Sequence, residues 1–102
     1  MEPTIEQALQ QGVIAHREGN FQEAVRLYRT VLQSQPTHLV ANHNLGVLAV
    51  SLNKSETALP LFKIALEANP NIDQFWISHI DTLIKLVMVN DAKRAFRRSV
   101  GR

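Results

Sequence analysis

Residues 44–70 read NLGVLAVSLNKSETALPLFKIALEANP, and this stretch decides the fold. It holds a Leu-Gly pair at its start, Ala58 near its middle, an aromatic ring four residues later at Phe62, and Pro70 at its end. The Ala, Leu, Glu and Lys residues favour helix. Pro70 lacks a backbone donor and cannot continue a helix that precedes it. The stretch therefore predicts two helical segments that end at the proline.

The same pattern recurs along the chain, and a fixed internal period is the sequence signature of a repeat array. The residues spaced 34 apart are Gly12 and Gly46; Ala24, Ala58 and Ala92; Tyr28, Phe62 and Phe96; and Pro36 and Pro70. In the third copy Ile80 replaces the glycine, and no proline follows. We expect paired helices near residues 5–18, 21–34, 38–52, 55–68, 72–88 and 90–99.

These positions resemble the tetratricopeptide repeat, whose units carry Leu-Gly, then Ala with an aromatic four residues on, and a closing Pro. The resemblance covers essentially the whole chain and is strongest in the second copy. It implies an all-α, right-handed superhelix of stacked antiparallel hairpins. We expect one domain over residues 1–102, with repeats at about 5–38, 39–72 and 73–102, the third incomplete. The resemblance places Tyr28, Phe62 and Phe96 between one hairpin and the next.

Helix starts are indicated by a Thr or Asn followed three residues later by Gln or Glu, the spacing of a capping box. This spacing occurs at Thr4, Asn20 and Asn71. Pro60 falls in the first turns of the fourth predicted helix, where proline costs at most one hydrogen bond, so we expect that helix to survive.

Composition excludes several classes of protein. The 102 residues include no cysteine, so neither a disulfide nor a thiolate metal site can form. The apolar runs are too short to cross a bilayer, and residues 1–10 show no secretory signal. We expect a cytoplasmic setting and no membrane partner.

A catalytic function is not indicated. No G-x-S-x-G, H-E-x-x-H or glycine-rich phosphate loop occurs, and the four histidines lack the spacing of metal ligands. Asp73 and Asp81 are too far apart to act as a carboxylate pair. We expect no enzyme, no metal and no cofactor.

A binding function is better supported, because stacked hairpins form a superhelix whose first helices line a concave groove. The resemblance implies a groove that takes a peptide or a partner helix. Its predicted lining residues are Leu9, Gln10, Val13, His16, Arg17, Val40, His43, Asn44, Val47, Ser51, Gln74, Ile77, Ser78 and Asp81.

The lining also separates kinds of tetratricopeptide repeat. Repeats that clamp the carboxyl terminus of chaperones use lysine, arginine and asparagine, and of the matching places here only Asn44 agrees. Asn44 resembles the asparagine with which the repeats of O-linked sugar transferases grip a peptide backbone, although it could equally bond a neighbouring helix or water. Residues 16–50 and 65–86 resemble the repeat regions that precede a transferase domain in bacterial proteins. The alternative function is therefore a recruitment module of a larger transferase.

The carboxyl-terminal segment is basic: residues 91–102 carry five cations against one acid. This charge raises an anionic polymer as an alternative ligand. We nevertheless expect no nucleic-acid partner, because no stacking platform of aromatic residues is evident there. Since the third unit lacks a capping helix, we expect an apolar face to associate with a partner, another copy included. The predicted residues are Leu86, Val89, Phe96 and Val100.

Overall fold

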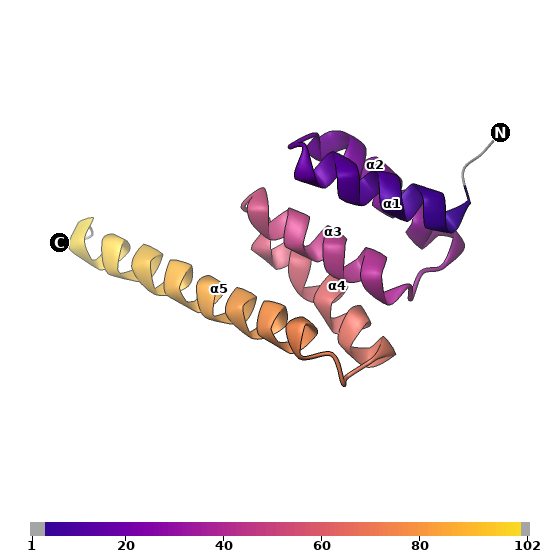
Figure 1. The fold of residues 1–102 in the computed structure, drawn as a ribbon. Coiled ribbons are helices and arrows are strands. Elements are labelled where there is room, and N and C mark those ends of the chain that lie inside the picture. The colour runs from indigo at the N-terminus through magenta and orange to yellow at the C-terminus, as the bar shows by residue number, and fades with distance from the viewer. Residues whose placement is uncertain (1–3, 101–102) are drawn as a thin grey trace.

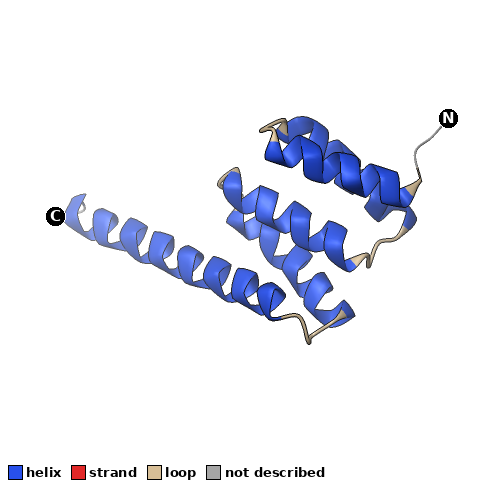
Figure 2. Cartoon of the chain, viewed as in Figure 1, coloured by secondary structure: helices blue, strands red, loops and turns tan. Residues whose placement is uncertain are grey.

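The computed structural model describes residues 4–100, and within this range every regular element is a helix (Figures 1 and 2). The helices are α1 (Ile5–Arg17), α2 (Phe21–Ser34), α3 (Leu39–Ser51), α4 (Ser55–Ala68) and α5 (Asp73–Val100). α1 with α2 and α3 with α4 form two hairpins that stack side by side, and α5 leaves the second hairpin and extends away from it (Figure 1). The all-α repeat architecture predicted from the sequence is confirmed.

The helix starts agree only in part with the predicted capping boxes. At Thr4 the box is complete: Oγ1 accepts from the backbone N of Gln7 at 3.1 Å, and Gln7 Oε1 accepts from the backbone N of Thr4 at 2.9 Å. Asn20 is the N-cap of α2, as predicted, but its side chain makes no capping bond. Asn71 lies in the loop before α5, one residue too early to be the N-cap, and its backbone N donates to Asn69 Oδ1. As expected, α4 continues through Pro60.

Each hairpin closes around a glycine and an aromatic ring. Tyr28 and Phe62 are completely or almost completely buried, and each ring lies where a Cβ atom on the glycine of its own hairpin, Gly12 or Gly46, would stand. From the sequence, these rings were expected only between successive hairpins. Tyr28 does also pack against Leu45 and other residues of α3, so a single ring joins both helices of its hairpin to the next unit.

A buried amide fixes the junction between the two hairpins. Asn42 is 1% exposed, and its Nδ2 donates to the carbonyl oxygens of Pro36 at 3.0 Å and His38 at 2.9 Å. Both carbonyls belong to the linker between α2 and α3, and the His38 carbonyl also accepts from the backbone N of Asn42. The amide therefore ties this linker to the first turn of α3 and helps to fix how the second hairpin follows the first.

The third hairpin predicted from the sequence does not form. Instead of two helices at 72–88 and 90–99, α5 is one helix of 28 residues. Its first half packs against α4, whereas every residue from 87 to 100 is exposed (Figure 1). Ala92 and Phe96, expected in a hairpin core by their spacing from Ala58 and Phe62, are therefore exposed as well, and Phe96 is 69% exposed.

Two substitutions in the repeat explain the continuous helix. The turns of the first two hairpins each contain a residue with positive φ, Gly19 at 77° and Asn53 at 61°. One period later stands Val87, and a β-branched residue strongly disfavours that conformation. Ile80 stands in the place of Gly12 and Gly46, so its side chain would occupy the space that an incoming Phe96 ring needs. A tight third turn is thus disfavoured at both its bend and its contact point.

Candidate functional site

The predicted groove residues line two neighbouring hollows along the first helices of the units. The hollow between α1 and α3 has a volume of about 330 Å³ and is mainly apolar. It is lined by Leu9, Gln10, Val13, Ile14, Arg17 and Val40, of which only Ile14 was not predicted. Ile14 is 51% exposed, so its omission left out part of the apolar surface.

The second hollow lies between α3 and α5 and has a volume of about 210 Å³. Its lining includes the predicted residues Val47, Ser51, Ser78 and Asp81, together with Val50, Phe62 and Thr82. The polar groups concentrate on the α5 side, and the aliphatic side chains come from α3. The structure thus gathers nine of the predicted residues into two hollows, five in the first and four in the second.

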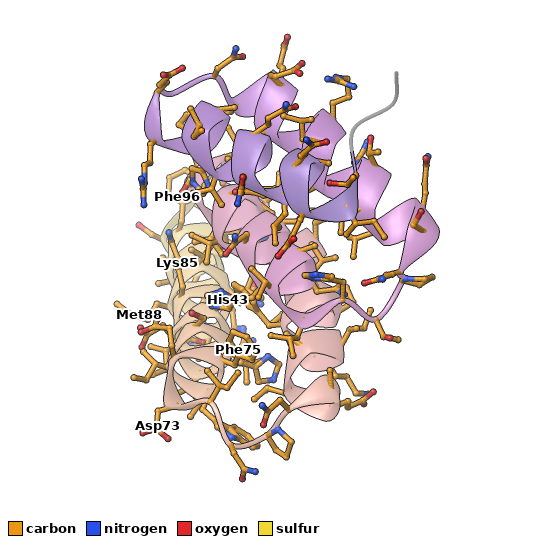
Figure 3. The ribbon with its side chains drawn as sticks, turned by 45° about the vertical axis from the view of Figure 1, so that its right-hand side comes forward. His43, Asp73, Phe75, Lys85, Met88 and Phe96 are labelled. Atoms are coloured by element: carbon orange, nitrogen blue, oxygen red, sulfur yellow. The ribbon has the colours of Figure 1, made fainter. Side chains whose placement is uncertain are left out.

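His43 joins α3 to α5. Its ring stacks on Phe75 with centroids 4.6 Å apart and an interplanar angle of 28°, and it also contacts Phe62 at 5.5 Å (Figure 3). His43 Nε2 lies 2.9 Å from Ser78 Oγ, which also accepts from Gln74 Nε2 at 3.3 Å. His43 and Ser78 were predicted to face a ligand. In the structure the imidazole ring of His43 and the hydroxyl of Ser78 make contacts that hold α5 against α3.

The surroundings of His43 favour its neutral form. Burial lowers the pKa of His43 below the ordinary value of 6.5, because desolvation penalises the imidazolium. The aromatic rings on either side offer little to replace lost water. A neutral imidazole at this joint can donate to or accept from the Ser78 hydroxyl, whichever tautomer is present.

Other predicted groove residues are placed differently. His16 packs edge-on against Phe21, with centroids 6.0 Å apart, and against Tyr28, so its ring is part of the first hairpin. Asn44 is half-buried on α3 and lines neither hollow, whereas Gln74 is exposed. Ile77 is 50% exposed on α5.

The four residues predicted for self-association all lie on α5, in two groups. Leu86 and Val89 border a hollow of about 430 Å³ between α5 and the turn that joins α3 to α4. Phe96 and Val100 are exposed farther along the helix, on the half of α5 that extends away from the two hairpins (Figure 1). The basic residues Lys93, Arg94, Arg97 and Arg98 are exposed too, whereas Arg102 lies outside the described residues. Nη1 of Arg94 lies 3.9 Å from Oδ1 of Asp91.

Two features of α5 were not predicted from the sequence. Phe75 is buried and carries the stacking contact with His43, although it holds no 34-residue partner among the aromatic residues. The second feature is an exposed apolar stripe on the first half of α5. The sequence did contain a signal for this stripe. Trp76, Ile80 and Leu83 stand at repeat positions that hold small or amide residues in the two earlier units.

Residues 15–76, more than half of the chain, match the tetratricopeptide repeat family. The chain belongs to this family. The matched range of the tetratricopeptide repeat begins near the end of α1 and ends in the first turn of α5, so it covers α2, α3 and α4 in full and excludes most of the long helix. A comparison with curated protein sequences finds no significant match.

Solved structures with similar folds include several described as MamA. MamA 41-end from Desulfovibrio magneticus RS-1 is 24% identical with a TM-score of 0.70, over 74% of this chain and 43% of that one. The MamA RS-1 ArsTM double mutant is 21% identical with a TM-score of 0.76, over 95% and 55%. MamA MSR-1 C2 is 23% identical with a TM-score of 0.74, over 97% and 57%. This chain therefore spans about half the length of these tetratricopeptide repeat-like structures, and the likeness concerns the fold.

Within residues 4–100, no helix is both long enough and apolar enough to span a bilayer. The same range holds no group of three or more His, Asp or Glu side chains arranged to bind a metal ion.

Proposed function

We propose that this tetratricopeptide repeat chain is a protein-interaction module that binds an extended peptide or a partner helix along the face lined by α1, α3 and α5. The observation that carries the proposal is the hollow between α1 and α3. Apolar side chains of Leu9, Val13, Ile14 and Val40 remain accessible there, beside the amide of Gln10 and the cation of Arg17. An apolar recess with a few polar groups at its edge is the usual form of a ligand site.

The chemistry of the lining indicates the kind of segment that fits. The first hollow offers aliphatic contacts with one cation, and the second offers Ser51 and Asp81 beside Val47. Asn44 is half-buried on α3, and its amide can both donate to and accept from a peptide backbone. A segment with aliphatic side chains, an acidic group near Arg17 and a basic group near Asp81 would match this distribution.

The test is binding to a peptide array, compared between the native chain and two variants. Asn44→Ala removes the central amide, and Val47→Glu places a charge in the second hollow. We expect both to weaken capture of the peptides that the native chain selects, by about tenfold or more, because a desolvated charge or an unpaired backbone group disfavours the complex.

Gln22→Glu is the matched control for Val47→Glu, since it adds the same charge at an exposed position on α2. It should leave the selected peptides unchanged. If Asn44→Ala and Val47→Glu keep native helicity and native peptide capture, the assignment of the binding face is wrong.

A further inference from the structure

α5 carries an exposed apolar stripe on the side turned away from α4. Trp76, Ile80, Leu83 and Val87 are 45%, 48%, 42% and 59% exposed, and they are separated by four, three and four residues. This alternation of four and three is the heptad pattern that keeps a seam facing a partner helix in a coiled coil. Ile77 and Ile84, each about half exposed, widen the stripe on one side. Phe75 and Thr82, which are buried, mark the opposite side of the helix.

The same positions in the two preceding units are covered. One and two periods before Trp76, Ile80 and Leu83 lie Asn42, Gly46 and Ala49, and Ala8, Gly12 and Ala15. All six are buried in their hairpins. The stripe is therefore a surface of a type that this fold covers with a second helix, but here the small residues are replaced by large apolar ones.

The distal half of α5 is poorly suited to cover the stripe from within the chain. A return would need a bend at Val87, where the other units use a residue with positive φ. It would also bring Phe96 onto Ile80, where the other units provide a glycine. A helix from another molecule meets neither restriction, because no short turn fixes its distance from α5.

We propose that the stripe binds the same stripe of a second copy of this chain, with the two α5 helices antiparallel. The charges at the ends of the seam favour this partner and orientation. Asp73 lies one turn before Trp76, and Arg94 and Arg97 continue the seam beyond Val87. An antiparallel pair brings the acidic end of each helix towards the basic end of the other. A parallel pair would place the arginines of both copies together.

The register follows from matching the four apolar residues. If Ile80 of one copy lies against Leu83 of the other, Trp76 lies against Val87, and the two-fold axis passes between Asp81 and Thr82. Asp73 then comes within about one helical turn, roughly 5 Å along the axis, of Arg94 of the second copy. Arg94 is available for this contact because its pair with Asp91 is long and solvent-exposed.

The indole of Trp76, at the start of the stripe, is held in place by a hydrogen bond. Its Nε1 donates to the carbonyl oxygen of Pro70 at 2.7 Å, which holds the ring against the start of α5. An anchored aromatic side chain loses less conformational freedom on association than a mobile one.

Sedimentation equilibrium of the native chain, from about 1 to 100 μM, tests the association. We expect a monomer–dimer equilibrium, and we expect Leu83→Glu to raise the dissociation constant at least about 100-fold, since each dimer carries the substitution twice. Phe96→Glu is the matched control: it adds the same charge on the same helix at a more exposed residue outside the seam, and it should dimerise as the native chain does. A native chain that stays monomeric throughout, or a dimer that Leu83→Glu does not weaken, would overturn the proposal.

Orientation is tested by disulfide formation, which is unambiguous because the native chain contains no cysteine. A mixture of Trp76→Cys and Val87→Cys chains should form the mixed disulfide under mild oxidation, while either variant alone should not. Disulfides within each variant alone would indicate a parallel pair. In an Ile80→Cys/Phe96→Cys chain, rapid formation of a disulfide within one monomer would show that the helix folds back instead. Either result contradicts the proposal, and neither bears on the groove that the proposed function uses.

Discussion

The Tyr28 ring lies where a side chain on Gly12 would stand: a Cβ atom built on Gly12 would be 2.7 Å from Cε1 of Tyr28. Phe62 has the same relationship to Gly46, where the built Cβ would be 2.7 Å from Cδ1. Real Cβ atoms do not approach rings so closely, and both rings are enclosed in the core. The glycine therefore sets the distance between the two helices of each hairpin.

Replacing Gly12 with alanine should destabilise the fold. Overpacking against a buried ring costs about 1–3 kcal/mol, and the better helix propensity of alanine returns about 1 kcal/mol. We expect a net loss of about 1 kcal/mol in the free energy of unfolding, measured by urea denaturation. Gln11→Ala, on the exposed neighbour, should change stability by only a few tenths. A Gly12→Ala chain more stable than the native one would contradict the close contact.

Restoring the repeat pattern in the third unit should shorten the molecule. Ile80→Gly/Val87→Asn supplies both the contact glycine and a residue that tolerates positive φ. We expect the distal half of α5 to return onto the proximal half, so that the longest dimension, 62 Å in the native chain, decreases in small-angle X-ray scattering at concentrations where the chain is monomeric. Ile84→Gly/Met88→Asn introduces the same two residues on α5 at positions outside the repeat register and should leave α5 extended. Equal scattering from both double variants would refute this account of the long helix.

The joint between α3 and α5 should weaken in acid. The pKa of His43 is below its ordinary value because the ring is partly buried, so the unfolded chain binds a proton more readily than the folded one. Stability therefore falls as the pH drops below about 6.5, towards the lowered pKa of the folded state. Thermal unfolding at pH 7.5 and pH 5 should show this loss.

A matched variant isolates the contribution of His43 from that of the other histidines. His43→Gln cannot be protonated, so it should lose less stability than the native chain between the two pH values. His16→Gln, which leaves the joint intact, should keep the native pH dependence. An unchanged pH dependence in His43→Gln would show that the joint does not respond to protonation.

Removing the Asn42 amide should destabilise the junction of the two hairpins. Asn42→Ala removes the side-chain hydrogen bonds to the carbonyl oxygens of Pro36 and His38, although the backbone N of residue 42 still donates to His38. Two lost hydrogen bonds of about 0.5–1.5 kcal/mol each cost about 1–3 kcal/mol together. We expect a loss of that size in chemical denaturation. Asn90→Ala removes an exposed amide from α5 and should have almost no effect. Equal stability of the two variants would mean that water replaces the donor at the junction.

The sequence by itself determined the two closed hairpins. The 34-residue spacing of Gly12 with Gly46 and of Tyr28 with Phe62 predicts them because each glycine and ring must meet for a hairpin to close. Local signals also sufficed for the capping box at Thr4 and for the tolerance of Pro60. The residues of the hollow between α1 and α3 followed from the repeat register, apart from Ile14.

Only the tertiary structure decided what happens after residue 72. Ala92 and Phe96 keep the period, yet they stay exposed, because periodicity records which side chains could pack and does not test whether the chain can bend to bring them there. The bend depends on the backbone conformation available to Val87, and the contact depends on the space beside Ile80. Likewise, the stacking of His43 on Phe75 joins residues 32 apart, and no local pattern specifies a contact that arises from how one helix crosses another.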